Sequence, residues 1–277
     1  MREEDVSAVH ETATAAFAHL DAQLGQPPHA PPDPAIVHIR HAHLVRTDPE
    51  GAWVAEDERG IAGCALAIRR ENVWGLSLLI VRPDVQSAGV GTALLNRANE
   101  YAAGARGRII LSSPDPRALR AYARLGLEVH PSLNASGVPR DVPWPDGIRE
   151  GDHTDIPLTE AVDRHVRGAA HGADIGAQLD MGQTLLIAPE RGYAVTGEGE
   201  LRLLAAFDDE AASDLLRAVL AMTNGGKAMI SWITSTQQWA ARVSLEAGLE
   251  LSANAGAVFV DGDVGPFRPY LPSGAFL

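Results

Sequence analysis

The N-terminal part of the chain places apolar and polar residues with the period of a helix. Apolar side chains recur every three or four residues over Val6–Leu24, and Gly25 follows. This spacing predicts an amphipathic helix that ends at the glycine. After the Pro-rich loop "GQPPHAPPDP", Asp33 and Pro34 form a typical N-cap and first-turn pair. They predict a second helix that runs toward Val45.

The pattern then changes to the shorter period of strands. The stretch "GAWVAEDERGIAGCALAIRRENVWGLSLLIV" contains three apolar runs, with turns at 58–60 and 70–72. It predicts an antiparallel meander. Helical spacing returns after Gly89, a strand follows in "RGRIILSS", and a short helix over 117–125 stops at Gly126. The predicted module is mixed α/β.

The second half of the chain repeats these patterns in the same order. "IREGDH" from residue 148 resembles "MREEDV" from residue 1, and "QQWAARVSLEAGLEL" from residue 237 resembles "DPRALRAYARLGLEV" from residue 115. The strand patterns "RGYAVTGEGELRLLAAF" and "MISWITS" lie between them. The repeat predicts a first copy over residues 1–135, a Pro-rich linker over 136–147 and a second copy over 148–277.

Composition narrows the classes of function. The formal net charge of −13 at pH 7 argues against binding to nucleic acid or to an anionic membrane. Cys64 is the one cysteine, which excludes an intrachain disulfide and a cysteine-rich zinc site. The start of the chain lacks the apolar region of a signal peptide, and no apolar run reaches the roughly 18 residues of a membrane-spanning helix. We therefore expect a cytoplasmic protein with no membrane partner.

The stretch "RPDVQSAGVGTALL" joins a strand pattern to a helix pattern. Gly89 and Gly91 lie at the predicted helix start, where the first backbone N–H groups have no partner within the helix and the dipole favours an anion. A phosphate can approach glycine backbone closely. The stretch lacks the Lys-Ser/Thr pair of a P-loop and the third glycine of a dinucleotide fingerprint. The residues alone leave open which anion binds, or whether the glycines only form a turn.

A second pattern downstream makes the glycine turn more specific. "DPRALRAYARLGLEV" places Ala118, Tyr122 and Gly126 at steps of four residues. Upstream, the residues Gln86–Gly91 match the pattern Q/R-x-x-G-x-G/A. In this order, with a meander before them, the two motifs resemble the GNAT superfamily of acyl-CoA-dependent N-acyltransferases. The resemblance covers roughly residues 1–135.

The resemblance implies an α/β (α+β) fold. We expect two tandem GNAT-like domains, each with a mixed, mostly antiparallel central sheet flanked by helices. The motif departs from the family at Asp115, where asparagine is usual, and at Leu127, where phenylalanine is usual. The family module also opens with a strand, whereas only "MRE" precedes the first predicted helix. The strand "GAVFVDG" near the end of the chain is a candidate to fill that place.

The resemblance also implies where acetyl-CoA, as the acyl donor, binds. A strand end would pair with the pantetheine arm, and the amides of the glycine turn would hold the pyrophosphate. Tyr122 would protonate the departing thiolate, since tyrosine, with an ordinary pKa of about 10, holds its proton at neutral pH. The expected cofactor-binding residues are Leu79, Ile80, Val81, Gln86, Ser87, Ala88, Gly89, Val90, Gly91, Thr92 and Asp115.

No residue is identified as the general base. Glu56, Asp57 and Glu71 are predicted to be solvated, so an ordered water is the alternative. His38 and His41 lie three residues apart on the second predicted helix, on what we expect to be an exposed face. No carboxylate or cysteine completes a metal site there, so we expect no bound metal. His41 remains a candidate to contact the acceptor or to act as a base.

The second copy lacks the chemistry of the first. "AAFDDEAASDLL" stands where the first copy has its glycine turn, and the carboxylates of Asp208, Asp209 and Glu210 would repel a pyrophosphate. Ser244 occupies the position of Tyr122. We therefore predict that the second copy does not bind CoA.

Two other segments of the second copy carry expectations. Arg164, Arg167 and His171 have the spacing of one helical face, which we predict to be solvated. The segment "GPFRPYLPSGAFL" holds several prolines and aromatic residues, and we expect it to be pinned against a surface.

The expected function is transfer of an acetyl group from acetyl-CoA to a primary amine of a small molecule, by direct attack and without an acyl-enzyme. Two alternatives stay open: a CoA-binding regulatory or scaffold protein, and an acetyltransferase acting on a protein N-terminus or lysine. A longer acyl donor is not distinguished from acetyl-CoA. The two copies predict a pseudo-dimeric monomer or a homodimer.

Overall fold

The computed structural model describes residues 1–27 and 30–277, so Pro28 and His29 of the predicted Pro-rich loop lie outside the described residues. Contacts between residues divide the chain into two compact units. The first unit comprises residues 1–69 and 74–105, and the second comprises residues 70–73 and 106–277.

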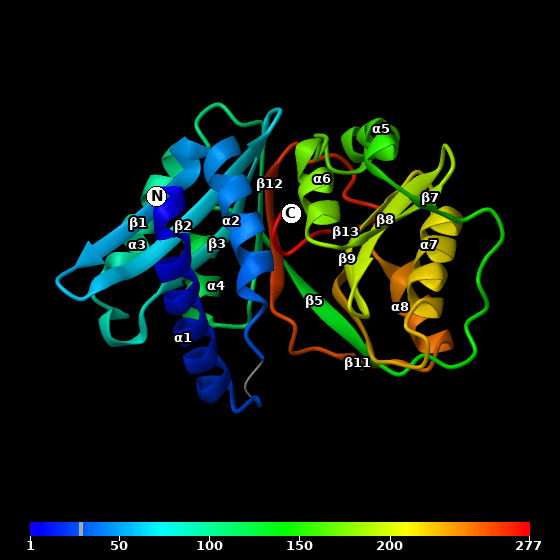
Figure 1. Cartoon of the computed structure of the whole chain (residues 1–277), viewed down its shortest axis with the longest axis horizontal. Coiled ribbons are helices and arrows are strands. Elements are labelled where there is room, and N and C mark those ends of the chain that lie inside the picture. Colours follow the sequence, from blue (N-terminus) through cyan, green and yellow to red (C-terminus); the bar gives the residue numbers. More distant parts are fainter. Residues whose placement is uncertain (28–29) are drawn as a thin grey trace. The chain divides into compact units, whose positions relative to one another are not determined.

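The first unit consists of a meander, two N-terminal helices and the helix that follows the meander (Figure 1). Helix α1 ends where Gly25 adopts a left-handed conformation with φ 65°, and α2 begins at the Asp33 cap, whose side chain accepts a hydrogen bond from Ala35 N. Both helix boundaries confirm the sequence prediction. The elements are η1 Glu3–Asp5, α1 Val6–Leu24, α2 Pro34–Thr47, η2 Pro49–Gly51, β1 Ala52–Asp57, β2 Gly60–Arg70, β3 Val73–Val81, η3 Pro83–Val85 and α3 Val90–Glu100.

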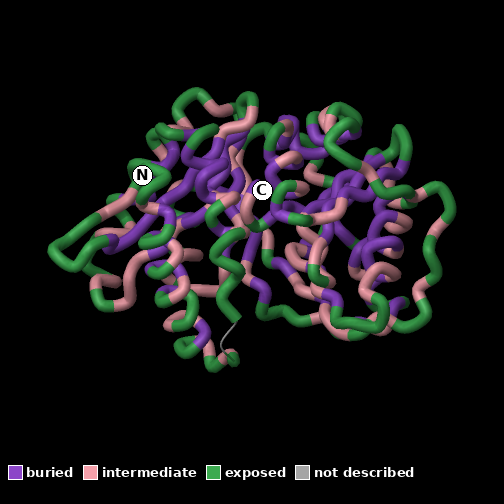
Figure 2. Tube along the Cα trace, in the orientation of Figure 1, coloured by how far each residue is buried: buried purple, intermediate pink, exposed green. Residues whose placement is uncertain are grey.

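The core of this unit lies around β2, which is buried along most of its length (Figure 2). Strand β1 pairs with it antiparallel. Trp74 on β3 is fully buried and donates its indole N–H to the carbonyl of Ala98 on α3, at 3.0 Å. This hydrogen bond and the buried apolar face of α3, which includes Leu94 and Leu95, hold the helix against the meander.

The second unit contains the motif with Tyr122 and the whole second copy. Its strands follow the order β4-β12-β5-β10-β9-β8-β7-β6, with β11 beside β5 and β13 beside β9. Every pairing recorded in this unit is antiparallel except β10 with β9. The elements are β4 Gly107–Ser112, α4 Pro116–Arg124, β5 Glu128–Gly137, β6 Arg149–Gly151, η4 His153–Asp155, α5 Ile156–Val166, α6 Ala173–Asp180, β7 Thr184–Ala188, β8 Gly192–Gly197, β9 Glu200–Ala206, α7 Asp209–Ala221, β10 Ala228–Thr234, α8 Gln238–Glu246, β11 Glu250–Ser252, β12 Ala257–Gly262 and β13 Tyr270–Leu271.

Strand exchange joins the two copies within this unit. The first residues of β5 pair with β12, near the end of the chain, while its later residues pair with β10 and β11 of the second copy. Strand β12 in turn lies between β4 and β5. The suggestion that "GAVFVDG" fills the opening strand of the first copy was wrong, because β4 and β5 both offer it a continuous antiparallel ladder.

The start of each copy runs beside its first long strand. In the second copy Arg149–Gly151 form β6, which pairs with β7. In the first copy the N-terminal amino group of Met1 donates to the carbonyl of Ala52 at 2.9 Å. Strand β5 continues to Gly137, so the Pro-rich sequence that begins at Pro131 is still a strand for its first residues.

Both faces of the second copy's sheet are covered. Strand β9 shows this by alternation: Leu204 and Ala206 face the cluster formed with α7 and α8, whereas Leu203 and Ala205 face the cluster formed with α5. A strand that is buried on both faces is apolar throughout, which explains the continuous run "LLAA". The element order of the second copy repeats that of the first, and the predicted mixed, mostly antiparallel fold with flanking helices is confirmed.

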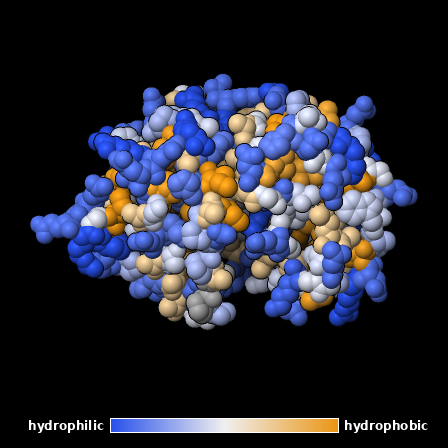
Figure 3. All heavy atoms as spheres, in the orientation of Figure 1, coloured by the Kyte–Doolittle hydropathy of each residue, from blue (hydrophilic) through white to orange (hydrophobic). Residues whose placement is uncertain are grey.

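The face of the molecule that Figure 3 shows is mostly polar. In the view of Figure 3 hydrophilic residues dominate and apolar residues form small separate groups. Among the described residues, no helix is long and apolar enough to cross a membrane.

Candidate active site

The connection from β3 to α3 in the first unit is a compact, polar turn. Arg82 anchors its beginning through ion pairs with Asp57 and Asp84. The side-chain amide of Gln86 donates to the carbonyl of Val81 at 3.1 Å. These contacts fix the path of the backbone between the last residue of the strand and the start of the helix.

Helix α3 begins without a side-chain cap. Gly89 is its N-cap residue and has φ 90°, and a Cβ at this position would meet no atom within 4 Å. The N–H groups of Val90, Gly91 and Thr92 have no hydrogen-bond partner in the part of the chain that the structure describes. Ser87 also has a positive φ, of 66°. The turn therefore presents backbone donors and a helix dipole to an anion.

Gly91 has a different role from Gly89. A Cβ at Gly91 would lie 3.3 Å from a methyl carbon of Val81, so the absence of a side chain lets α3 start close against the end of β3. The residues from Leu79 to Thr92 that are predicted to bind the acyl donor thus lie on one continuous stretch, from the end of β3 through the turn to the start of α3.

Tyr122 lies on α4 in the second unit and is buried, with 6% of its surface exposed. Its ring packs edge to face against Phe259 of β12, with centroids 5.6 Å apart. Burial, followed by the nearby carboxylate of Asp115, raises the pKa of Tyr122 above its usual range. The phenol is therefore protonated at neutral pH, which is the state a general acid requires.

Asp115 is the N-cap of the same helix. Its side chain accepts from the backbone N–H of Arg117 at 2.8 Å and forms an ion pair with the Arg117 guanidinium. Although burial opposes it, these hydrogen bonds hold the pKa of Asp115 below its usual value. Asp115 thus has a structural role as the N-cap of α4, and a contact with the acyl donor would be a second role.

The carboxylates considered as bases are exposed or paired. Asp57 accepts from Arg82 and from the backbone N–H of Arg59, and these hydrogen bonds lower its pKa. Glu71 pairs with Arg164 at 2.7 Å. The lowered pKa makes Asp57 a weak base at neutral pH.

Cys64 is fully buried in β2. Burial raises the pKa of its thiol to about 12. A protonated, inaccessible thiol is not a nucleophile, so Cys64 is not suited to form an acyl-enzyme.

The histidines of α2 are not all on an exposed face, as the sequence suggested. His38 is exposed, but His41 is 1% exposed. Its Nε2 lies 2.9 Å from the Arg40 guanidinium, which can only donate, so the proton is on Nδ1, and that atom has no partner among the described residues. Burial and the charge of Arg40 lower the pKa of His41 to about 3. This imidazole is neutral and too weak a base for proton transfer at neutral pH. The described residues contain no metal-binding cluster of histidine, cysteine or carboxylate side chains.

The equivalent positions of the second copy are filled by the protein itself. Asp208 caps α7 by accepting from Ala211 N at 2.8 Å, and Arg191 pairs with Asp208 and Glu210. Although burial opposes it, hydrogen bonds from Arg191 and the backbone lower the pKa of Asp208. Ser244, opposite Tyr122 in the repeat, is fully buried.

Two residues of the predicted solvated face are in fact buried. Helix α5 ends at Val166, so Arg167 and His171 lie in the following connection, 1% and 0% exposed. Asp163 accepts from the backbone N–H of His171 at 2.9 Å, and Tyr193 donates to Asp163. Only Arg164 is solvated, as predicted. The sequence signal that was missed is Gly168, whose φ of 78° ends helical spacing before His171.

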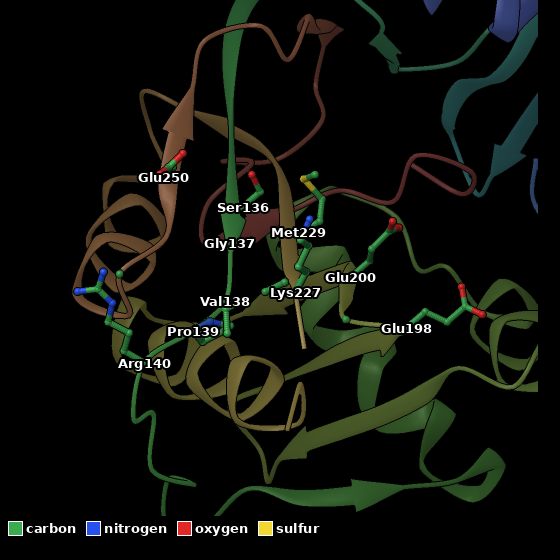
Figure 4. A pocket seen from close by; sticks show the side chains of 13 residues that line it. Ser136, Gly137, Val138, Pro139, Arg140, Glu198, Glu200, Lys227, Met229 and Glu250 are labelled. Carbon is green, nitrogen blue, oxygen red and sulfur yellow. The ribbon is translucent and has the colours of Figure 1, made fainter. Parts of the chain in front are cut away.

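A hollow of about 830 Å³ lies at the N-terminal ends of β9 and β10. Figure 4 shows its lining side chains spread over the neighbouring strands β11, β5, β10 and β9, with Glu250, Ser136, Lys227 and Glu200 among them. Glu200 pairs with Arg202, and the other charged groups are exposed. The hollow is at the opposite end of β9 from α7, and no predicted site residue lines it.

Residues 48–129 match the family model of the acetyltransferase (GNAT) domain. The matched segment begins just before β1 and includes the GNAT glycine turn, α4 and Tyr122. A search of curated proteins found no match.

Three solved structures resemble the chain over nearly its whole length, each at 14% identity. A Pyrococcus horikoshii protein named a "putative acetyltransferase" matches with a TM-score of 0.79 over 99% of this chain and 93% of its own. A GCN5-related N-acetyltransferase from Sphaerobacter thermophilus matches with a TM-score of 0.58 over 99% and 96%. A tandem GNAT protein from the clavulanic acid biosynthesis pathway matches with a TM-score of 0.53 over 95% and 97%. These similarities establish a GNAT-like fold that extends beyond the segment matched by the family model.

Proposed function

We propose that the chain is an acetyl-CoA-dependent N-acetyltransferase that acts on a primary amine of a small molecule, with its one donor site in the first copy. The observation that carries this proposal is the uncapped start of α3 within the segment that matches the GNAT family model. Free N–H groups at a glycine-rich helix start are suited to a pyrophosphate. In this assignment residues 1–135 form the catalytic domain, 136–147 the linker and 148–277 a second domain without a CoA site.

The strand end and the turn supply binding. The backbone of Leu79–Val81 would pair with the amide groups of the pantetheine arm, as an added strand would. The amides from Gln86 to Thr92 would hold the pyrophosphate, and Asp115, the cap of α4, would be a further residue that contacts the acyl donor. Such binding positions the thioester so that the reaction with the amine resembles an intramolecular one.

The chemical step requires two proton movements. The neutral amine forms a bond to the thioester carbonyl carbon, and the carbon–sulfur bond breaks. The amine gives up a proton to solvent, through an ordered water in the absence of an identified base, and the Tyr122 hydroxyl gives its proton to the departing thiolate. Tyr122 recovers a proton from solvent afterward, so the balance closes without a covalent enzyme intermediate.

A second function has one observation in its favour. Asp57 and Glu71, the carboxylates that follow or join the meander strands, are both occupied by arginines. A CoA-binding regulatory protein without turnover would need no base. An acceptor that is a protein N-terminus or lysine is the third possibility, because the chemistry of transfer is the same.

Release of free CoA thiol with a panel of amines tests the proposal. We expect turnover with at least one small primary amine and no turnover with its N-acetylated form. Binding of acetyl-CoA without thiol release from any small amine or peptide would favour the regulatory protein, and release with peptides alone would favour the protein acceptor. Absence of acetyl-CoA binding would contradict all three.

A further inference from the structure

The segment from Pro266 to Leu277, which we call the end segment, lies against the sheet of the second copy. Strands β9 and β10 are parallel and are paired only at Met229 and Glu200, near their first residues. Toward its other end β9 pairs with β13 of the end segment instead. In Figure 1 this part of the chain, in red, continues from β12 to β13 beside β9.

Strand β13 pairs with the end of β9. In the first copy the equivalent strand end, Leu79–Val81 of β3, is the one proposed to pair with acetyl-CoA. Leu204 and Ala205 pair antiparallel with Leu271 and Tyr270, and Ala206 N donates to the Pro269 carbonyl at 3.2 Å. These residues end β9, and the next α-helix is α7, just as Leu79–Val81 end β3 and the next α-helix is α3. The backbone groups proposed to pair with pantetheine in the first copy are thus paired with protein in the second.

Gln237 holds the backbone of the end segment. Its side-chain amide donates to the Phe267 carbonyl at 2.7 Å, and its carbonyl accepts from Tyr270 N at 3.3 Å and from the Trp239 indole at 2.9 Å. Gln237 is the N-cap residue of α8, as Asp115 is of α4. Gln237 therefore binds the end segment at the position where the first copy has Asp115, which is proposed to contact acetyl-CoA.

The start of α7 also contacts the end segment. Arg268 forms an ion pair with Asp209 in the first turn of the helix. Together with the Arg191 pairs, this contact gives partners to all three carboxylates at the position equivalent to the proposed anion site of the first copy. Because these groups are exposed, the ion pairs add little stability. They show that the carboxylates already have partners within the protein.

The rest of the end segment is anchored in the interior. Tyr270, Leu271, Phe276 and Leu277 are at most 1% exposed. The Tyr270 hydroxyl donates to the Leu277 carbonyl at 2.7 Å, and Nε2 of His171 lies 2.9 Å from the same oxygen. This burial distinguishes the end segment from a loosely attached tail.

We propose that the end segment fills the acyl-donor groove of the second copy, which makes this copy a binding module for an extended peptide of its own chain. The identity of the groove rests on the proposed function, whereas the contacts of the end segment do not. Recognition is by strand addition, with Gln237 as the polar clamp and Tyr270 and Leu271 as the buried side chains on either face. The second copy therefore has no room for acetyl-CoA.

A protease site inserted between Gly265 and Pro266 in the full chain tests the proposal, because both residues are exposed. The protein is folded, cut and passed through a size-exclusion column with and without excess acetyl-CoA. We expect the end segment to remain bound, a synthetic peptide of residues 266–277 to exchange with it, and a scrambled peptide not to exchange. One acetyl-CoA should bind per chain before and after the cut. Release of the segment from protein with unchanged circular dichroism would overturn the proposal, as would its displacement by acetyl-CoA at a second site.

Paired variants of the uncut chain provide a second measurement. Gln237→Leu removes hydrogen bonds to the end segment, and we expect on the order of tenfold faster amide exchange at Tyr270 and Ala206, with unchanged acetyl-CoA affinity. Asp115→Leu, at the matching position of the first copy, should leave exchange at Tyr270 unchanged. Unchanged exchange in Gln237→Leu would contradict the clamp. If no acetyl-CoA bound to any form, the proposed function would fail while the exchange data still reported on the end segment.

Discussion

The two copies start the same helix in opposite ways. In the first copy Gly89 has a positive φ, and the first amides of α3 are left open. In the second copy Asp208 accepts from an amide of α7, and arginines pair with the carboxylates around it. One fold position can therefore hold a helix start with open amides or a helix start closed by side chains. The difference requires only a few residues, because the helix dipole is present in both.

The largest effect is expected at Tyr122, whose equivalent position in the second copy is Ser244. Tyr122→Phe keeps the ring against Phe259 but removes the proton donor, so we expect kcat to fall by about 10²–10⁴-fold with little change in acetyl-CoA affinity. Steady-state thiol release and calorimetry measure the two quantities. Tyr101→Phe is the matched control, since its hydroxyl donates to Asp48 and lies in the first unit. An unchanged kcat in Tyr122→Phe would mean that this tyrosine only packs.

A carboxylate at the start of α3, as at the start of α7, should weaken binding of the acyl donor. Gly89→Asp places a carboxylate at the open amides and a side chain at φ 90°. Charge repulsion and backbone strain, the latter worth about 1–2 kcal/mol, should weaken acetyl-CoA binding by at least about tenfold. Gly25→Asp is the control, because this glycine also has a positive φ and open space but ends a helix. Equal affinity in Gly89→Asp and the wild type would place the pyrophosphate elsewhere.

The second helices of the two copies, α2 and α6, each carry a buried polar side chain, but only the one on α6 forms an ion pair. Asp174 on α6 is paired with Arg70, at 2.6 Å for both oxygens, whereas His41 on α2 is buried neutral with a pKa of about 3. Below about pH 6.5 the unfolded chain binds a proton at His41 that the folded chain does not. Stability is therefore retained above that pH and lost as the pH falls toward 3, by about 2 kcal/mol at about pH 5.

Urea unfolding at about pH 5 and about pH 7.5 measures this difference. His41→Gln should remove most of the pH dependence, whereas His38→Gln, at an exposed position, should retain it. Equal pH dependence in His41→Gln and the wild type would assign acid lability to other groups.

Local patterns predicted most elements, and long-range contacts explain what they missed. Asp33, Asp115 and Gly25 mark helix boundaries through the hydrogen bonds and dihedral angles of their own neighbours, so they are legible in the sequence. The position of β12 is not, because its pairing with β4 and β5 joins residues far apart in the chain. His171 likewise contacts Tyr270 and Leu277 of the end segment, which are far from it in the chain. The contact of Phe259 with Tyr122 had no local signal, whereas Gln237 could have been found by aligning it with Asp115.

The smallest effect is expected at Asp208. Its replacement tests whether this residue only caps α7 or also keeps acetyl-CoA out of the second copy. Asp208→Ala removes one side-chain cap, which should cost about 1 kcal/mol of stability, and loss of the exposed Arg191 pair should add little. Asp33→Ala, the matching cap of α2 with the same 2.8 Å bond, should cost a similar amount in urea unfolding. Calorimetry should still find one acetyl-CoA per chain in Asp208→Ala, because the end segment, and not this carboxylate alone, occupies the groove. A second equivalent bound by this variant would show that charge at the helix start had kept the donor out.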